Sequence, residues 1–364
     1  MRIIFVGGGT LGSCGPLIAI AETLKKRDSH IDIVWIGTQN GPEKNIISSY
    51  GYQYRSIHAG KLRRYFSFKN FTDVVHSVLG FLQSLYVLAT LKPSLIIGAG
   101  SFVQVPLIYA RALAFRKTRV IIHQQDIKPG LANLLCAPHA DRITVATKES
   151  FADFPQEKTL CIGNPIREEI RNGSIAKAYD IFHLDKEKPV VLILGGGTGA
   201  AALNALVIAA LPYLLDVCQI IHVTGIGKER TDNNYPPTYH WYDLLTHSLA
   251  HAYAVADVCV TRAGFSTLTE LAVLAKPILV IPMPNSHQEV NAAFFEKQHA
   301  AVVLKEKGLD PKNLAARITS LLHNQHERFQ LSARIAQVMP SDATERLVNE
   351  IKRLADETIY KKKW

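Results

Sequence analysis

Residues Thr261–Asn291 read TRAGFSTLTELAVLAKPILVIPMPNSHQEVN and contain the strand–helix–strand pattern that decides the fold. The apolar run Val258–Val260 ends in a glycine turn, a helix-like segment opens at Ser266, and a second apolar run covers Ile278–Ile281. Two strands joined by a helix form the basic unit of a parallel sheet. The stretch therefore predicts an α/β fold.

The start of this helix is predicted to bind an anion. Backbone N–H groups at a helix N-terminus lack partners within the helix, and the helix dipole is positive there. We place Glu270 in the first turn, where its carboxylate can accept hydrogen bonds from two adjacent hydroxyls, as an acidic residue does for ribose in dinucleotide folds. An ordinary capped helix would explain the same stretch taken alone, so the rest of the chain must decide.

Composition and charge set limits on the class of protein. A chain of 364 residues predicts two domains, and 48% hydrophobic with 20% charged residues is ordinary globular composition. The net charge of +10 suits phosphorylated ligands, an anionic membrane surface or nucleic acid. Because no nucleic-acid-binding motif is recognisable, nucleic acid is not expected as a partner.

Cysteine usage and apolar segments predict where the protein works. The five cysteines are scattered without a CxxC pair, which indicates reduced thiols in the cytosol and no structural zinc. The N-terminal apolar run ends at Val6, too early for a signal-peptide core. The segment Val78–Leu91 is too short to cross a bilayer, and we expect a core or interfacial helix there.

Both halves of the chain alternate short β-branched runs with helix-like segments, which predicts two doubly wound parallel sheets. The predicted strands are Arg2–Val6, Ile31–Ile36, Leu95–Gly98, Val120–His123 and Arg142–Ala146, followed by Val190–Leu194, Gln219–Val223, Val258–Val260 and Ile278–Ile281. Each half opens with a strand, a glycine cluster and a helix, at Ile3–Gly15 and at Val190–Asn204. Glycines let the backbone approach a ligand closely, and two such clusters favour halves that face each other across a cleft.

The domain boundary is predicted at the sequence CIGNPIR, residues 161–167, because Asn-Pro is a turn signal. We assign residues 1–163 to an N-terminal domain and residues 164–341 to a C-terminal domain. Residues 342–364 are predicted to form a closing helix that runs to about Ile359 and packs back on the N-terminal domain.

The order and spacing of these loops resemble the MurG family over nearly the whole chain. This family transfers N-acetylglucosamine (GlcNAc) from UDP-GlcNAc to the lipid-linked muramyl-pentapeptide precursor of the bacterial cell wall. The resemblance rests on GGTLG at residues 8–12 with Pro16, GAGSFV at 98–103, HQQD at 123–126, GNPIR at 163–167, GGGTGA at 195–200 and DATER at 342–346.

The resemblance implies a GT-B fold of two Rossmann-like domains. Residues 164–341 would be the domain that binds the UDP-sugar donor, and residues 1–163 the domain on the acceptor and membrane side. The resemblance also implies an inverting transfer (lipid I to lipid II) by a peripheral protein on the cytoplasmic face of the membrane, with roles in cell shape and division. Carried over by residue, the family's donor contacts are Glu270 on the ribose, Ser266, Thr267, Leu268 and Thr269 along the nucleotide diphosphate, Thr198 near the phosphates, Gln288 on GlcNAc, Arg167 from the hinge, and Thr10, Leu11, Gly12 and Asp126 on the N-terminal side.

No metal or other cofactor is expected. The sequence contains no Asp-x-Asp pair, the usual carboxylate pair that holds a metal against a sugar-nucleotide diphosphate. Helix dipoles and Arg167 would then balance the charge of the leaving group.

Three residues depart from the family pattern. Ser13 stands where the family has a histidine, Leu11 replaces a glycine, and Asp126 replaces an asparagine. A serine hydroxyl cannot take up a proton near neutral pH as imidazole does, and loss of an acid–base group typically costs ~10²–10⁴-fold in rate. We hypothesise that the catalytic base has moved to Asp126 or to His123. In the alternative, Asp126 is a surface carboxylate and the protein is slow or inactive.

The stretch Lys61–Phe71 interleaves cations with aromatic residues and favours contact with an anionic membrane surface. A basic loop whose aromatics cover the first domain's core is the alternative. Three other functions stay open: transfer to a different acceptor, nucleotide-sugar binding without catalysis, and, least favoured, a UDP-sugar epimerase.

Overall fold

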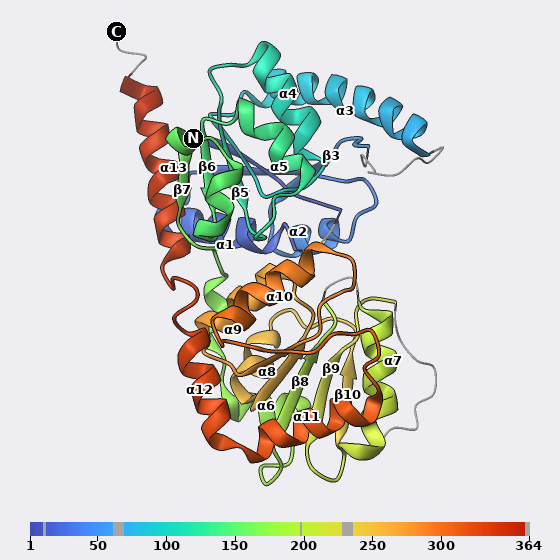
Figure 1. The fold of residues 1–364 in the computed structure, drawn as a ribbon. Coiled ribbons are helices and arrows are strands. Elements are labelled where there is room, and N and C mark those ends of the chain that lie inside the picture. Colours follow the sequence, from blue (N-terminus) through green and yellow to red (C-terminus); the bar gives the residue numbers. More distant parts are fainter. Residues whose placement is uncertain (10–11, 61–68, 197–198, 228–235, 361–364) are drawn as a thin grey trace. The chain divides into compact units, whose positions relative to one another are not determined.

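Figure 1 shows the computed structural model, which describes residues 1–9, 12–60, 69–196, 199–227 and 236–360, and of residues 69–72 and 356–360 the backbone alone. Contacts divide the chain into unit 1, Met1–Arg167 with Ser341–Trp364, and unit 2, Glu168–Pro340. By this division residues 164–167 of the predicted hinge go with unit 1.

Unit 1 is built on a seven-stranded parallel sheet in the order β3-β2-β1-β4-β5-β6-β7. Its strands are β1 Arg2–Val6, β2 Asp32–Gly37, β3 Gln53–Ser56, β4 Leu95–Gly98, β5 Arg119–Gln124, β6 Arg142–Val145 and β7 Thr159–Cys161. Its helices are α1 Gly15–Arg27, α2 Glu43–Ser49, α3 Lys69–Leu91, α4 Gln104–Ala114, α5 Leu131–Cys136 and α13 Ala343–Tyr360, with short 3₁₀ turns η1 Ala137–His139, η2 Lys148–Asp153 and η3 Gln156–Lys158.

Strand β1 shows why helices cover both faces of this sheet. Successive side chains of a strand point to opposite faces, so Ile3 and Phe5 enter one apolar cluster while Ile4 and Val6 enter another. Helices α1 and α13 close the first cluster, and α3, α4 and α5 close the second (Figure 1). Burial on both faces explains the nearly continuous apolar strands.

The last helix completes the core of unit 1. Leu347 and Ile351 of α13 are fully buried in the cluster that also contains the apolar face of α1. Arg27 of α1 pairs with Glu345. At the start of α13 the hydroxyl of Thr344 donates to the carbonyl of Ile166 at 3.1 Å.

Unit 2 has a six-stranded parallel sheet in the order β10-β9-β8-β11-β12-β13. Its strands are β8 Val190–Leu194, β9 Gln219–Val223, β10 Tyr239–Tyr242, β11 Val258–Thr261, β12 Ile278–Val280 and β13 Val302–Val303. Its helices are α6 Ile175–Phe182, α7 Ala201–Ala210, α8 Leu249–Val255, α9 Phe265–Val273, α10 His287–Lys297, α11 Pro311–His323 and α12 Gln325–Ile335, with 3₁₀ turns η4 Glu168–Asn172 and η5 Leu211–Tyr213.

The predicted class of two doubly wound parallel sheets is confirmed, and every predicted strand is present with its ends shifted by at most one residue. The unpredicted strands β3, β7, β10 and β13 all lie at the outer edges of the two sheets. An edge strand has one neighbour and is often short and partly exposed. β3, for example, has no buried residue, so its sequence lacks an apolar pattern.

Helix α3 is longer than the apolar segment that predicted it. It covers Lys69–Leu91, and its part Asp73–Leu91 is long and apolar enough to cross a membrane by length and composition, so the expectation that it is too short is wrong. Only 28% of that part is buried. The buried side packs against α4 and supplies Leu88 to the core of unit 1, as a helix of a folded domain does.

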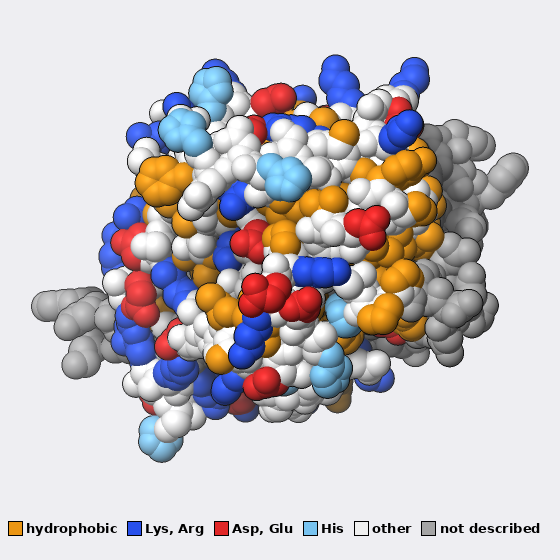
Figure 2. Space-filling model, turned by 90° about the horizontal axis from the view of Figure 1, so that it is seen from below, with side chains coloured by type: hydrophobic (Ala, Val, Ile, Leu, Met, Phe, Trp, Pro, Cys, Tyr) orange, Lys and Arg blue, Asp and Glu red, His pale blue; other side chains and the backbone are white. Residues whose placement is uncertain are grey.

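Basic side chains are spread over the surface that Figure 2 shows. On this face Lys and Arg lie among acidic and apolar side chains. The net charge of +10 is therefore not gathered into one basic patch on this face.

Candidate functional site

The predicted loops of unit 1 meet at one edge of its sheet. Strand order reverses direction between β1 and β4, and open α/β sheets bind ligands at such a switch point, beyond the carboxyl ends of the strands. The glycine loop after β1, the loop at Gly98–Ser101 after β4 and the loop at Gln124–Asp126 after β5 all leave this edge. The hydroxyl of Ser101 donates to the carbonyl of Gly8 at 2.8 Å and ties two of these loops together.

A buried carboxylate that the sequence did not single out holds the first glycine loop. Glu43 is fully buried and accepts a hydrogen bond from the Gly9 amide at 3.2 Å and from the Thr38 amide at 2.8 Å. The Tyr54 hydroxyl lies 3.1 Å from the same carboxylate, and burial together with the Glu43 charge raises the pKa of Tyr54. Glu43 begins α2 and resembles any acidic residue in a first turn, so only its contacts reveal it.

A chain of buried amides positions the loop that carries Asp126. Gln104 donates to Asn133 at 2.7 Å, and Asn133 donates to Gln124 at 2.7 Å. Gln124 in turn donates to the backbone carbonyl of Asp126 at 2.7 Å, as Ser150 does at 3.3 Å. The network holds the backbone of residue 126, whose side chain is half-buried.

His123 is fully enclosed at the end of β5. Its Nδ1 lies 3.0 Å from the Thr144 hydroxyl and its Nε2 lies 2.9 Å from the Asn164 side-chain oxygen. Burial lowers the pKa of His123 to about 4, although the bond to Asn164 acts in the opposite direction. With both ring nitrogens engaged inside the protein, His123 is poorly placed to take a proton from a substrate, so the geometry favours Asp126 of the two proposed bases.

We expect burial of neutral His123 to make the protein less stable in mild acid. The unfolded chain protonates histidine near pH 6.5 and the folded protein near pH 4, so between these values the unfolded state binds more protons and stability rises with pH. The contribution of His123 to the free energy of unfolding is present above about pH 6.5 and is lost as pH falls. The loss is roughly 2 kcal/mol between pH 7 and pH 5.

This pH dependence is measurable as the difference in urea midpoint between pH 7 and pH 5. His123→Gln should reduce that difference, whereas His30→Gln at an exposed position should leave it as in the unchanged protein. Equal pH dependence in all three proteins would contradict the assignment. His222, whose pKa burial also lowers to about 4, accounts for part of the dependence that remains in His123→Gln.

The predicted residues of the first glycine loop are described in part. Thr10 and Leu11 lie outside the described residues. Gly12 is exposed, and Ser13 is 9% exposed in the turn before α1. Cys14 is the N-cap residue without a side-chain cap bond, and its thiol pKa is raised to about 12, first by burial and then by Glu43. The thiol at residue 14 is therefore neutral.

In unit 2 the strand order reverses between β8 and β11. The glycine loop after β8 and the segment 262–264 after β11 therefore leave the sheet at its switch point. Gly196 and Gly199 have positive φ angles of 85° and 72°, a backbone conformation that glycine adopts readily. Thr198 lies outside the described residues.

Helix α9 begins at Phe265 with Gly264 as its N-cap and no side-chain cap bond. The first backbone bond into the helix runs from the Leu268 amide to the Gly264 carbonyl at 3.0 Å. Ser266 and Thr267 are partly exposed in this first turn, whereas Leu268 and Thr269 are fully buried. An anion at this end can therefore meet the side chains of residues 266 and 267, while residues 268 and 269 face the core.

Glu270 lies in the second turn of α9, and the prediction of the first turn is wrong. The helix starts one residue earlier than expected, and Glu270 is its sixth residue, beyond the 3.6 residues of one turn. Glu270 as a whole is 8% exposed, and its carboxylate accepts a hydrogen bond from the Tyr253 hydroxyl at 2.8 Å. Tyr253 of α8 thus orients the carboxylate.

Gln288 links the loops that follow β11 and β12. Its side-chain oxygen accepts hydrogen bonds from the amides of Ala263 at 3.2 Å and Met283 at 3.1 Å. Its NH₂ group is then the part that can donate to a ligand hydroxyl. Ser286 caps α10 by accepting a hydrogen bond from the backbone amide of Gln288, which holds the backbone at residue 288.

Arg262 was not predicted, although it lies inside the stretch that decides the fold. It is 7% exposed, donates to the Ile281 carbonyl at 3.0 Å and pairs with Glu306. This arginine braces the loop before α9. Arg167, predicted to reach the donor, lies within 3.2 Å of the Tyr50 hydroxyl in unit 1.

The described part of the chain contains no cluster of three or more His, Cys, Asp or Glu side chains that could hold a metal ion. The five cysteines are free thiols. Of these, Cys161 is partly exposed and the others are buried.

Two Rossmann-like units, each with a glycine loop at the switch point of its sheet, form a GT-B fold, and the family models identify the chain as a glycosyltransferase. Residues 3–145 match the N-terminal domain of glycosyltransferase family 28, and residues 190–347 match its C-terminal domain. The crystal structure of MurG from Acinetobacter baumannii has a TM-score of 0.70 and 22% identity, and the match covers 97% of this chain and 99% of that one.

A curated relative extends the match to the whole chain. The UDP-N-acetylglucosamine–N-acetylmuramyl-(pentapeptide) pyrophosphoryl-undecaprenol N-acetylglucosamine transferase of Lachnoclostridium phytofermentans is 35% identical over 97% of this chain and 99% of its own length. The chain belongs to the MurG family. A UDP-GlcNAc 2-epimerase from Neisseria meningitidis has a TM-score of 0.69 at 12% identity, over 97% of this chain and 100% of that one, which is a likeness of fold alone.

Proposed function

We propose that this protein is an inverting glycosyltransferase that moves GlcNAc from UDP-GlcNAc to the lipid-linked muramyl-pentapeptide. Relatives that carry this name match nearly the full length of the chain. The structural observation that carries the proposal is the start of α9, which has no side-chain cap and lies at the switch point of unit 2 with Glu270 one turn further along.

The donor would bind along this helix. The diphosphate sits at the N-terminus of α9, where backbone amides and the helix dipole stabilise negative charge. Glu270, oriented by Tyr253, accepts hydrogen bonds from the ribose hydroxyls. The Gln288 NH₂ group donates to hydroxyls of GlcNAc. Each of these groups belongs to unit 2.

The reaction would then be a single displacement. An acceptor hydroxyl attacks C1 of GlcNAc from the side opposite the diphosphate, the new C1–O bond forms, and the bond from C1 to the diphosphate oxygen breaks. Asp126 accepts the proton of the attacking hydroxyl. The electron pair leaves with UDP, whose charge the amides of α9 stabilise, so no metal is needed at the diphosphate.

A panel of acceptors tests the function. UDP release is measured with UDP-GlcNAc and a lipid-linked muramyl-pentapeptide, with other lipid or glycan acceptors, and with none. The proposal expects release with the muramyl acceptor. Release with other acceptors alone would support a different transferase. Donor binding without release would support a non-catalytic protein, an outcome worth testing because the nearly buried Ser13 replaces the family histidine.

The outer face of α3 is proposed to contact the membrane. Large apolar side chains are exposed along one stripe of this helix, including Val74 at 57%, Val78 and Leu82 at 55% and Tyr86 at 69%. Such a patch marks an interaction surface, and a lipid-linked acceptor makes a membrane the fitting partner. In the basic and aromatic stretch Lys61–Phe71, residues 61–68 lie outside the described residues, as do the side chains of the rest, so its membrane contact stays a prediction.

Changing Val78 and Leu82 together to glutamate should weaken binding to anionic vesicles by about 100-fold or more, because two apolar side chains that enter the bilayer contribute ~1.5–3 kcal/mol each. Co-sedimentation with vesicles measures it. The control changes two other exposed apolar residues to glutamate, Leu113, which is 70% exposed on α4, and Phe329, which is 72% exposed on α12. Its net charge falls by the same amount. Equal binding by both proteins would remove α3 from the membrane surface.

A further inference from the structure

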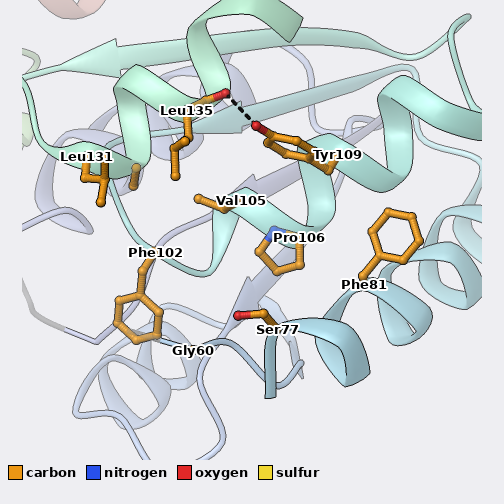
Figure 3. A pocket seen from close by; sticks show the side chains of 10 residues that line it. Gly60, Ser77, Phe81, Phe102, Val105, Pro106, Tyr109, Leu131 and Leu135 are labelled. Atoms are coloured by element: carbon orange, nitrogen blue, oxygen red, sulfur yellow. Dashed lines mark hydrogen bonds between the residues drawn. The ribbon is translucent and has the colours of Figure 1, made fainter. Parts of the chain in front are cut away.

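Unit 1 has an apolar cavity of about 240 Å³ among α3, α4 and α5, which is partly open to the surface (Figure 3). Figure 3 shows side chains of the three helices converging on this space, Phe81 from α3, Val105 and Tyr109 from α4, and Leu131 from α5. Gly60, Ser77, Phe102, Pro106, Ala132 and Leu135 complete the lining.

The hydroxyl groups at the wall of this cavity already have acceptors in the protein. The Ser77 hydroxyl donates to the carbonyl of Asp73 at 2.8 Å, and the Tyr109 hydroxyl donates to the carbonyl of Leu135 at 3.4 Å. The cavity therefore offers a hydrocarbon surface. Ligand sites are typically concave and mostly apolar, so this cavity can hold the hydrocarbon part of a ligand.

A polar pocket adjoins the cavity at Phe102, whose side chain lines both. Gly9 of the first glycine loop, residues 38–42, His58 and His76 line this second pocket. The two imidazole rings have centroids 5.6 Å apart. The walls also adjoin along the chain, because His76 lines the polar pocket and Ser77 the apolar cavity. A hydrocarbon site beside a site with imidazoles and a glycine loop suits an amphiphile with an anionic head.

We propose that the apolar cavity binds the first isoprene units of the acceptor's polyprenyl chain, with the attached diphosphate in the adjoining polar pocket. This proposal rests on the proposed function, since the relatives' acceptor is a pyrophosphoryl-undecaprenol. An apolar cavity of about 150 Å³ holds benzene, with six carbons. By proportion, 240 Å³ has room for roughly ten carbons, which is about two isoprene units.

The test compares acceptors whose diphosphate carries a methyl group or a chain of one, two, three or four isoprene units, below their micelle concentrations. For the unchanged protein the acceptor KM should fall by at least about tenfold between methyl and two units, because each buried methylene contributes favourably, and should change little beyond two units. Ala132→Phe, which fills the cavity, should bring the ratio of the two KM values close to one. Phe81→Ala, which enlarges it, should extend the fall to three units.

Leu134→Phe is the control, because it introduces the same ring on the exposed side of the same helix and should retain the full KM ratio. Thermal melting shows that each variant is folded. If Ala132→Phe keeps the ratio of the unchanged protein, or if no dependence on chain length exists below two units, the cavity does not hold the chain.

A binding measurement without turnover separates this proposal from the proposed function. Geranyl diphosphate should raise the melting temperature of the unchanged protein more than inorganic pyrophosphate does, and Ala132→Phe should abolish that difference. If this holds while no acceptor supports UDP release, the cavity site stands and the transferase function fails. If transfer occurs but geranyl diphosphate and pyrophosphate act alike on the unchanged protein, the cavity site fails alone.

Discussion

Asp126→Asn is expected to lower kcat by about 10²–10⁴-fold, because an amide cannot accept the proton of the attacking hydroxyl. The protein should stay folded, since Gln124 and Ser150 bind the backbone carbonyl of residue 126 and the substitution keeps the side chain's shape. The measurement is the rate of UDP release at saturating donor and acceptor.

Asp153→Asn provides the matched control, because this carboxylate is exposed at the end of η2 in the same unit and its loss should leave kcat unchanged. A second arm adds Ser13→His to Asp126→Asn, which restores imidazole where the family has it. We expect that addition to recover part of the lost rate. Turnover of Asp126→Asn at the rate of the unchanged protein would show that residue 126 is not the base.

Glu270→Ala is expected to weaken UDP-GlcNAc binding by about 100-fold, because hydrogen bonds to a charged group contribute ~1.5–3 kcal/mol each and the ribose would lose two. Titration calorimetry measures the Kd directly. A thermal shift gives the same information, since donor at 100 times Kd stabilises the unchanged protein by ~2.7 kcal/mol and should stabilise the variant far less.

The ribose contact can be isolated with a donor that lacks the 2′-hydroxyl. The unchanged protein should bind this analogue more weakly than UDP-GlcNAc. Glu270→Ala should bind the analogue and UDP-GlcNAc about equally well, because the effects of two groups in contact are not additive. Glu289→Ala, at an exposed position of α10, is the control that should keep normal affinity. Additive losses would show that Glu270 does not contact that hydroxyl. Tyr253→Phe should have a smaller effect, since tyrosine orients the carboxylate without touching the donor.

The inner strands of both sheets could be predicted to within one residue because burial on both faces requires continuous apolar runs. The edge strands could not. β13 has two residues and β3 has none that is buried, so neither leaves a local pattern. The apolar residues of α3 predicted a core or an interfacial helix without deciding between them, and only the structure shows that most of these residues are exposed.

The candidate site also contains residues that the sequence could predict and residues that it could not. Asp126, Glu270 and Gln288 were predicted because they belong to motifs that the family shares. Glu43 and Arg262 were not predicted, because their roles rest on contacts with Gly9 and Glu306, each far away in the sequence. A motif identifies residues that meet a ligand, whereas the residues that hold the motif's backbone are chosen by the neighbours that folding supplies.

The sequence by itself determined the succession of strands, glycine loops and helices, and with it the fold class and the family. Only the tertiary structure decided which polar groups are buried next to one another. It shows that Leu268 and Thr269 face the core, and that His123 is held neutral between Thr144 and Asn164. The physical reason is that periodicity records local burial, while hydrogen-bond partners, pKa values and cavities depend on atoms from distant segments.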